Sequence, residues 1–300
     1  MKSESKSGER FTLKKRVGVV LRLTRFPALA TAIADPWAGY ALGSGRWSGD
    51  SWETWAFLAL IGVAFYAAGM VTNDLADRKR DGLSRKDRPL PSGEIGIGGA
   101  WFLVILLLLL GFLGCAFLGD RAIVCGAVLV GTIFLHNFVT KTHLVFGLIT
   151  MGTCRMLNIG LGMIVSEGGV LLEPILALGG YVLAICLIAE LEDRPYNPRW
   201  LYGAMVLSGV SVGWILCSAS NFWVVIPILC LGLSLLPSLF GALRVEARGE
   251  GIGKVVGHAI RGIILVDSAL VLGGGQWEAA LLIGVLWPVA WGLRWIAPVS

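Results

Sequence analysis

Charged residues are scarce in this chain of 300 residues, where they make up 15% of the total. Soluble domains carry about 25% charged residues. The hydrophobic share of 56% and the mean hydropathy of +0.76 also lie well outside that class. Several apolar runs have about 20 residues, which a helix needs to cross a hydrocarbon core about 30 Å thick. The composition therefore excludes a soluble domain and predicts a polytopic helical membrane protein.

Other absences narrow the class further. Runs such as LVILLLLLGFLG do not alternate between apolar and polar residues, which excludes a transmembrane β-barrel. The six cysteines lie in apolar runs and show no spacing typical of a metal site or a disulfide framework. The sequence has no glycine-rich phosphate loop, zinc signature or nucleophile elbow. Residues 1–16 lack the apolar core of a signal peptide, so we expect a polar cytoplasmic tail on a single membrane domain, 1–300.

The apolar runs predict ten membrane-spanning helices. The ninth contains His258, Arg261 and Asp267, which leaves a partly interfacial position open as an alternative for that segment. The predicted spans are 18–43, 53–72, 98–118, 122–139, 143–165, 170–189, 200–219, 222–243, 254–274 and 277–297.

The distribution of Lys and Arg predicts the orientation of these spans. The connections 73–97, 140–142, 190–199 and 244–254 together hold twelve Lys and Arg, whereas the connections on the opposite side hold only Arg46 and Arg121. Short cytoplasmic loops carry the excess of basic residues. We therefore expect a multi-pass protein of the cell membrane with both termini on the cytoplasmic side.

Two acidic clusters fall on that same side, NDLADRKRD at 73–81 and AELEDRPYN at 189–197. On a helix, Asn73, Asp77 and Asp81 form one stripe, and so do Glu190 and Asp193 with Asn197. Like charges on a stripe repel, so a positive group is needed to stabilise them. Oxygen ligands from two helices suit Mg²⁺, which also bridges to substrate phosphates. The predicted metal ligands are Asn73, Asp74, Asp77, Asp81, Glu190 and Asp193.

Basic residues close to these clusters are suited to hold phosphate oxygens that the metal does not. The sequence thus predicts a metal–phosphate site at the cytoplasmic mouth of a helical bundle. The alternative is a solvated loop whose charges only set topology. The basic residues are Arg78, Lys79, Arg85, Lys86, Arg88, Lys141 and Arg194.

The first acidic cluster and the residues around it resemble those of a known family. NDLADRKRD matches the pattern N-D-x-x-D-x-x-x-D of the UbiA superfamily of intramembrane prenyltransferases, and RKDRPLPSGEI resembles that family's basic continuation. LRLTRFPALATAIADPWAGYAL is similar to its first helix, and the two acidic motifs follow the expected spans, two and six. The fragments CRMLNIGLG and ADPWAGYAL are similar to the UbiA-like, or EboC-like, branch.

The resemblance implies an all-α bundle of nine to ten helices around a central cavity. It implies Mg²⁺ on the two acidic motifs, a prenyl diphosphate donor, and transfer of the isoprenyl group to an aromatic or other small lipophilic acceptor. Membrane lipid is then a partner and nucleic acid is not, while the oligomeric state stays open. The implied catalytic residues are Asn73, Asp77, Asp81, Glu190 and Asp193, and the implied substrate-binding residues are Arg25, Arg88, Lys141, Arg155, Asn158 and Asp35.

The chain departs from the family pattern at three places. Asn197 stands where many relatives have a carboxylate, Pro195 lies inside the second stripe, and Asn137 replaces the Tyr of a Y-x-x-x-K pattern that ends at Lys141. These changes leave room for a terpene cyclase of the same type or for a non-catalytic lipid-binding or scaffold member.

Three charged residues inside predicted spans carry open alternatives. We expect Arg155, with Asn158 on the same face, to point at the donor diphosphate, and the alternative is a structural ion pair with Asp35 or Asp267. Asp35 is expected to contact the acceptor or a cation, unless it pairs with Arg155. Arg25 matches the basic residue of the family's first helix, with snorkelling to head groups as the alternative.

Two other classes of membrane protein fit less well. A CDP-alcohol phosphotransferase would need an acidic residue where Arg78 stands, so we reject it despite DGLSR at 81–85. A transporter would place its main acids on broken helices at mid-membrane, whereas the acids here lie at one face.

Overall fold

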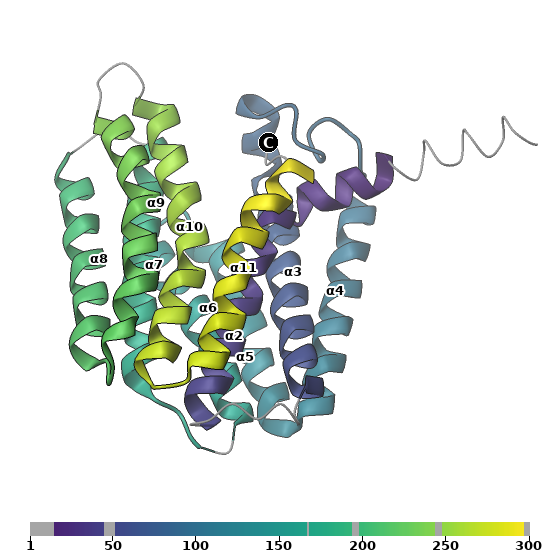
Figure 1. The fold of residues 1–300 in the computed structure, drawn as a ribbon. Helices are drawn as coiled ribbons and strands as arrows, with labels where there is room; N and C mark the ends of the chain where they lie inside the picture. Colours follow the sequence, from purple (N-terminus) through teal and green to yellow (C-terminus); the bar gives the residue numbers. More distant parts are fainter. Residues whose placement is uncertain (1–14, 45–51, 167, 194–197, 244–247, 297–300) are drawn as a thin grey trace, which may run out of the picture.

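The computed structural model describes residues 15–44, 52–166, 168–193, 198–243 and 248–296, which form a bundle of helices (Figure 1). No strand occurs in this described part. Every predicted span corresponds to a helix or a pair of helices, and the predicted all-α class is confirmed. The helices are Lys15–Leu23, η1 (Phe26–Ala28), α2 (Leu29–Ser44), α3 (Trp52–Ser84), α4 (Ile97–Leu118), α5 (Asp120–Leu135), the π-helical η3 (His136–Thr140), α6 (Leu144–Val165), α7 (Leu172–Asp193), α8 (Pro198–Ser218), η4 (Phe222–Val224), α9 (Val225–Leu243), α10 (Arg248–Gly273) and α11 (Trp277–Ile296).

The lengths of these helices fit a multi-pass membrane protein. Eight of the described helices are long and apolar enough to cross a membrane, and the bent pair Lys15–Leu23 and Phe26–Ser44 makes a possible ninth. The tenth predicted span is helical too, but its described apolar part, Trp277–Leu293, is shorter than the rest. The number of spans is therefore eight or nine by length, against ten predicted.

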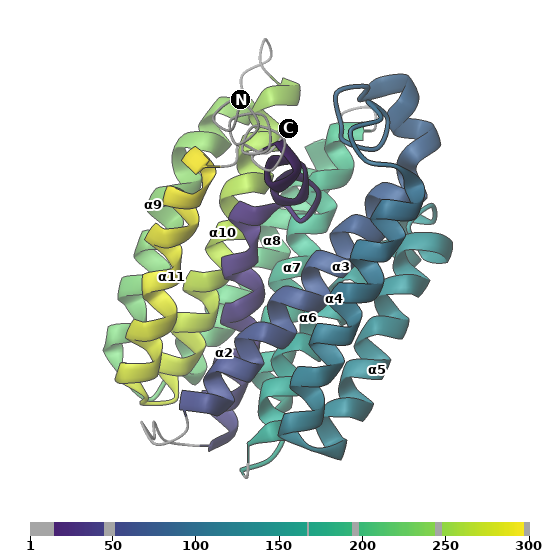
Figure 2. The same cartoon turned by 90° about the vertical axis from the view of Figure 1, so that its right-hand side faces the viewer.

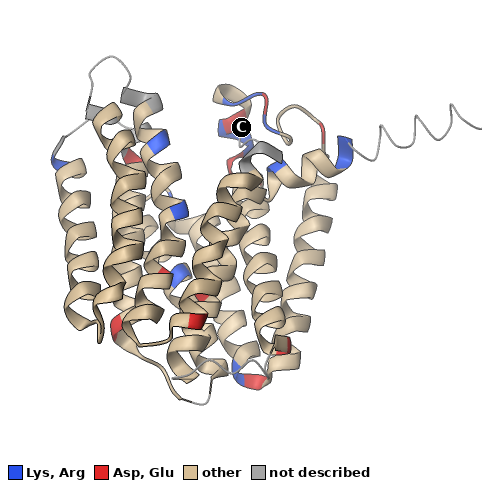
Figure 3. Ribbon diagram, in the orientation of Figure 1, with Lys and Arg blue, Asp and Glu red and all other residues tan. Residues whose placement is uncertain are grey.

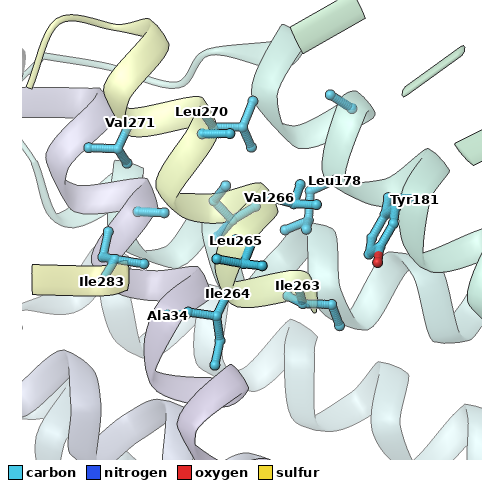
Figure 4. Close-up of a cluster of buried hydrophobic side chains, with 14 of the residues drawn as sticks. Ala34, Leu178, Tyr181, Ile263, Ile264, Leu265, Val266, Leu270, Val271 and Ile283 are labelled. Carbon is cyan, nitrogen blue, oxygen red and sulfur yellow. The ribbon is translucent and has the colours of Figure 1, made fainter. Parts of the chain in front are cut away.

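The central helices of the bundle are α2 and α10. Helix α2 packs on α3, α6, α10 and α11, and α10 packs on α2, α7, α9 and α11, as both side views show (Figures 1 and 2). In the span Gly251–Gly273 of α10, 67% of the apolar window is buried, against 22% for Ile97–Leu118 of α4. The alternative of a partly interfacial ninth span is therefore wrong, because its apolar residues form the centre of the core (Figure 4).

The outer helices present apolar side chains to the outside. Phe102 and Leu109 on α4 and Leu233 on α9 are each more than 60% exposed. In water such surfaces would be costly, but hydrocarbon tails solvate them as well as a protein core does. The bundle is thus built for a lipid surround, with its polar groups turned inward or placed at its ends.

The first predicted span, 18–43, is broken near its start. The helix Lys15–Leu23 and the segment Phe26–Ser44 meet at an angle of 50°. Pro27 has no N–H to donate to the carbonyl of Leu23, so the α-helical ladder stops there. Arg25 takes up the turn with φ 48° and ψ 52°, the one positive φ at a non-glycine residue in the described part. Such a conformation is costly for an arginine and is often kept at a functional site.

Helices α2 and α6 approach each other closely through glycines. A Cβ at Gly162 would collide with the carbonyl oxygen of Pro36, and one at Gly39 would collide with that of Ile159. Small residues at such crossings let two backbones pack directly on each other. This contact brings Asp35 of α2 opposite Arg155 of α6.

Candidate active site

The acidic stripe occupies the last three turns of α3. Asp74, Asp77 and Asp81 are all buried, while the intervening residues 78–80 are exposed. The helix continues past the predicted membrane edge at 72 to Ser84. The predicted stripe is Asn73, Asp77 and Asp81, whereas the fully buried set is the three Asp, and Asn73 is half-buried. Charged residues gather at this end of the bundle (Figure 3).

Arg80 of α3 itself pairs with Asp77 at 3.2 Å, and three basic side chains from other elements also contact the stripe. Arg88 Nη1 lies 2.7 Å from Asp81 Oδ2 and 3.6 Å from Asp74 Oδ1. Arg25 Nη2 lies 3.8 Å from the same Asp74 oxygen. Lys141 Nζ lies 2.6 Å from Asp77 Oδ1. We call the three acids and the three bases from other elements the mouth cluster.

Lys141 is positioned by the π-helical turn η3. Its ammonium also donates to Asn73 Oδ1 at 3.4 Å. Asn137, within the turn, donates to the carbonyl of Gly69 at 3.0 Å and to Thr72 Oγ1 at 2.8 Å. The Asn that replaces the family's Tyr therefore ties η3 to α3 and holds Lys141 against the stripe.

Arg88 is held by the connection between α3 and α4, which folds back over the helix end. Its backbone N–H bonds to the carbonyl of Arg85, and the N–H of Ser92 bonds to the carbonyl of Arg88. Glu94, in the same connection, pairs with Arg22 of the N-terminal helix. The connection thus joins the start of the chain to the end of α3 and buries the Arg88 side chain to 10% exposure.

A cavity of about 540 Å³ opens beside the mouth cluster. Four arginines line it, Arg25, Arg85, Arg88 and Arg261, with a single carboxylate, Asp87. The remaining walls are mostly apolar or aromatic and include Tyr66 of α3 and Ile260 of α10. An excess of guanidinium groups with an apolar extension suits a molecule with an anionic head and a hydrocarbon body.

Arg261 and Tyr66 were missed as site residues by sequence reasoning. The signal for Arg261 was present, because an arginine inside a span usually faces a cavity. For Tyr66 the sequence offers no such signal, since it is one aromatic residue in an apolar run.

Arg155, Asp35 and Asn158 form a separate group of contacts. Arg155 Nη1 lies 2.8 Å from Asp35 Oδ2, and its other donors reach the carbonyl and the hydroxyl of Thr31. Asn158 Nδ2 donates to the same Asp35 oxygen at 2.9 Å. The structure thus shows the alternative ion pair, and none of these three residues is among those that line the cavity.

Asp267 of α10 completes this group. It is fully buried, lies beside Asp35, and is close to Arg155. Within the described residues, neither of its oxygens has a hydrogen-bond donor. We call Asp35, Arg155, Asn158 and Asp267 the deep cluster. The Arg155 guanidinium also lies 5.4 Å from the centre of the Tyr66 ring, so the deep cluster contacts one residue that lines the cavity.

The second acidic motif is described only in part. Glu190 is partly buried near the end of α7 and is not among the residues that line the cavity. The side chains of Asp193 and Asn197 lie outside the described residues. In the described part, no three His, Cys, Asp or Glu residues form a group that could hold a metal ion. The pairing of the two acidic motifs therefore stays a prediction.

The first motif nevertheless offers suitable oxygen ligands. Asp74 Oδ1 and Asp81 Oδ1 are buried and lack a hydrogen-bond partner in the described structure. Unsatisfied buried carboxylate oxygens are costly. Carboxylate and amide oxygens are also the donors that Mg²⁺ prefers. The residues present thus fit the predicted ion.

Together these features define an integral-membrane helical bundle with an arginine-lined cavity over a buried acidic stripe. A model of the UbiA prenyltransferase family matches residues 36–251, well over half of the chain. The chain belongs to the UbiA prenyltransferase family.

Individual relatives agree with this membership. The chain is 32% identical to the digeranylgeranylglyceryl phosphate synthase of Methanospirillum hungatei over 47% of this chain and 51% of that protein. It is 37% identical to the 4-hydroxybenzoate octaprenyltransferase of a Marinomonas species over 32% of this chain and 36% of that protein. The matched regions thus span about half or less of these relatives.

A solved structure shows the same fold. It is a UbiA homologue from Archaeoglobus fulgidus bound to GPP and Mg²⁺, with a TM-score of 0.61 and 17% identity. The likeness covers 84% of this chain and 99% of that one. At this identity it supports the shared fold and carries no residue role across.

Proposed function

We propose that this protein transfers an isoprenyl group from a prenyl diphosphate to a lipophilic acceptor in a Mg²⁺-dependent reaction. The observation that carries the proposal is the cavity lined by four arginines beside three buried carboxylates. The names of the relatives support it, since those proteins are prenyltransferases or prenylated-lipid synthases. The solved homologue with GPP and Mg²⁺ supports the class of donor.

The donor's diphosphate belongs at the mouth cluster. Asn73, Asp74, Asp77 and Asp81, with Glu190 and Asp193, would hold the Mg²⁺. When bound, the ion supplies positive charge that stabilises diphosphate as a leaving group. Arg25 and Arg88 line the cavity and point their forks at the stripe, so each can turn from a carboxylate to a phosphate oxygen.

The chemistry then follows from where charge develops. The C1–O bond of the donor breaks, and its electron pair leaves with diphosphate. The acceptor's nucleophilic atom bonds to C1 and gives up a proton. Arg25, Arg88 and Lys141 stabilise the negative charge that grows on the leaving group. Tyr66 lines the cavity, and an aromatic ring there can stabilise the positive charge that grows on the allylic carbon.

The orientation of the reaction is part of the proposal. The mouth cluster lies at the end of α3 that leads into the basic connection 85–96. By the positive-inside rule this end is cytoplasmic, so we place the acidic motifs and both termini on the cytoplasmic side of the cell membrane. Water-soluble diphosphate would then leave to the cytoplasm, and the lipophilic product would leave to the bilayer.

Two alternatives differ in product. A terpene cyclase of the same fold would release diphosphate without joining the isoprenyl group to an acceptor, and a non-catalytic member would release none. The chain purified in nanodiscs, supplied with Mg²⁺ and isotope-labelled geranyl diphosphate, separates the three. We expect diphosphate release together with labelled adducts of an acceptor from a panel that includes 4-hydroxybenzoate and geranylgeranylglyceryl phosphate.

The controls are one impaired and one neutral variant. Asp77→Asn should slow release by roughly 10²- to 10³-fold, whereas Asp120→Asn, an exposed carboxylate at the start of α5, should not change it. Release that persists in EDTA, or labelled hydrocarbon as the sole product, would rule out Mg²⁺-dependent transfer.

A further inference from the structure

Asp267 is a buried carboxylate that the proposed transfer does not use. It lies within the span Gly251–Gly273 of α10 and is 0% exposed, as is Asp35 of α2. Among the described residues, neither oxygen of Asp267 has a hydrogen-bond partner, and Asp35 Oδ1 also lacks one. Three unsatisfied carboxylate oxygens are costly to bury. This cost indicates that something other than the surrounding side-chain donors satisfies them.

The charges around Asp267 do not balance. Asp35 lies within hydrogen-bonding reach of it. Arg155 pairs with Asp35 and also acts on Asp267, so two carboxylates share one guanidinium. The other helices that pack on α10 bring no further charge to this depth. The charged residues of α7, α8 and α11 lie near the helix ends, and α9 has none. One buried negative charge is therefore uncompensated, which is strongly unfavourable.

A proton fits both the charge and the geometry of this pair. Two carboxylates that share a site cannot both stay ionised without a large repulsion. One proton removes the excess charge and turns one carboxylate oxygen into a donor. Asp35 Oδ2 already accepts hydrogen bonds from Arg155 and Asn158. Asp35 Oδ1 is therefore the oxygen that remains to accept a hydrogen bond from Asp267.

Two other occupants fit less well. A hard metal ion takes about six or more oxygen ligands, whereas the pair offers three unpartnered side-chain oxygens. Within the described residues, no group of three His, Cys, Asp or Glu could hold a metal ion. A buried water molecule could donate hydrogen bonds to these oxygens, but it would leave the excess negative charge in place.

We propose that Asp267 and Asp35 bind one proton between them, with Asp267 donating to Asp35 Oδ1. The resulting hydrogen bond joins α10 to α2, beside the ion pair that joins α6 to α2. Helix α10 also carries Ile260, which lines the cavity. The bound proton thus holds one wall of the cavity against the centre of the bundle. The proton site is independent of the proposed transfer, because no step of that reaction passes through it.

Infrared spectroscopy tests the inference directly. The full chain is purified in a detergent without ester or acid groups, and its spectrum at neutral pH is compared with the spectra of variants. A protonated carboxyl group has a C=O stretching band that is separate from carboxylate bands and moves to lower wavenumber in D₂O. We expect Asp267→Asn to lose one such band. Asp120→Asn, an exposed carboxylate on α5, is the matched control and should keep every band.

The partner variant shows whether the proton is shared. Asp35→Asn leaves Asp267 as the carboxylate available to Arg155, and a buried guanidinium needs an anion. Asp267 should then ionise, so the same band should disappear although Asp267 is still present. If one of the two variants does not fold, the other still removes the pair and decides whether the band belongs to it.

Thermal unfolding adds a second measurement. Asp267→Asn should unfold at about the temperature of the unmodified chain, because its amide can donate to Asp35 Oδ1 as the protonated acid does. A large rise in melting temperature would overturn the inference, because it would show that Asn had relieved repulsion between two ionised carboxylates. The melting temperature of the unmodified chain should also be the same in sodium chloride and in choline chloride.

Three further results would overturn the inference. The first is an unchanged spectrum in Asp267→Asn. The second is a band that is lost in Asp267→Asn but kept in Asp35→Asn, because the proton would then belong to Asp267 alone. The third is a sodium-dependent rise in melting temperature that Asp267→Asn removes, because a metal ion would then occupy the site. None of these measurements requires prenyl transfer, so failure of the proposed function leaves the inference intact.

Discussion

The mouth cluster and the deep cluster use the same chemistry in different surroundings. Each contains a buried carboxylate bonded to an arginine, Asp81 with Arg88 at 2.7 Å and Asp35 with Arg155 at 2.8 Å. Arg88 also lines the cavity. The donors of Arg155 are directed to Asp35 and Thr31, both on α2. An arginine that borders a cavity can exchange its carboxylate partner for a ligand. An arginine on one helix whose donors are directed to another helix instead holds the two helices together.

The largest effect on the free energy of unfolding is expected from a substitution in the deep cluster. Arg155→Ala would leave Asp35 and Asp267 buried without their cation, which should reduce stability by about 3–5 kcal/mol. Thermal unfolding in detergent measures this loss. Adding Asp35→Asn should restore much of the stability, because one stranded carboxylate is removed. A stable single variant that has lost binding of a prenyl diphosphate analogue would show that Arg155 serves the substrate after all.

The next largest effect is expected on turnover, from a substitution in the mouth cluster. Asp77→Asn keeps an oxygen for Lys141 but removes a negative charge, so turnover should fall by roughly 10²- to 10³-fold, as for loss of one preorganised electrostatic group. The melting temperature should stay close to that of the unmodified chain. Turnover is followed as diphosphate release. A large drop in melting temperature would mean that Asp77 has a structural role, like that of Asp35 in the deep cluster.

A smaller effect is expected for the arginine that borders both the stripe and the cavity. Arg88→Lys keeps the charge but loses the planar fork, so donor binding should weaken by about 1.5–3 kcal/mol. Calorimetric titration with geranyl thiodiphosphate and Mg²⁺ measures this change. Lys86→Gln, in the same connection but exposed, is the matched control. Equal weakening in both variants would indicate a general loss of positive potential.

The smallest effect concerns the second acidic motif. If Asn197 stands at a ligand position, Asn197→Asp adds a carboxylate and should lower the Mg²⁺ concentration for half-maximal rate by roughly fivefold, the factor that about 1 kcal/mol gives. The readout is the rate against free Mg²⁺. An unchanged requirement would place residue 197 away from the metal, as Pro195 could cause by ending the helix.

The sequence predicts the helices well because each one is a local property. A run of about 20 apolar residues satisfies its backbone only as a helix in lipid, so most predicted span ends agree with the helix ends to within a few residues. The exceptions are α3, which continues from the predicted end at 72 to Ser84, and α10, which begins at Arg248 instead of 254. Helical spacing also predicts the stripe Asn73, Asp77 and Asp81, and in the structure the buried residues are Asp74, Asp77 and Asp81, with Asn73 half-buried. The break at Arg25 was missed, although Pro27, which causes it, stands in the sequence.

What the sequence by itself determined is the set of helices, the acidic stripe of α3 and the class of ligand that such a stripe attracts. These depend on residues within a few turns of one another. Only the tertiary structure decided that Arg155 meets Asp35 and that Arg261 lines the cavity with Arg88. Helices that are apolar nearly all round give little indication of which face meets which neighbour. The close approach of α2 to α6 through glycine, and the burial of α10 at the centre, are properties of the packed bundle.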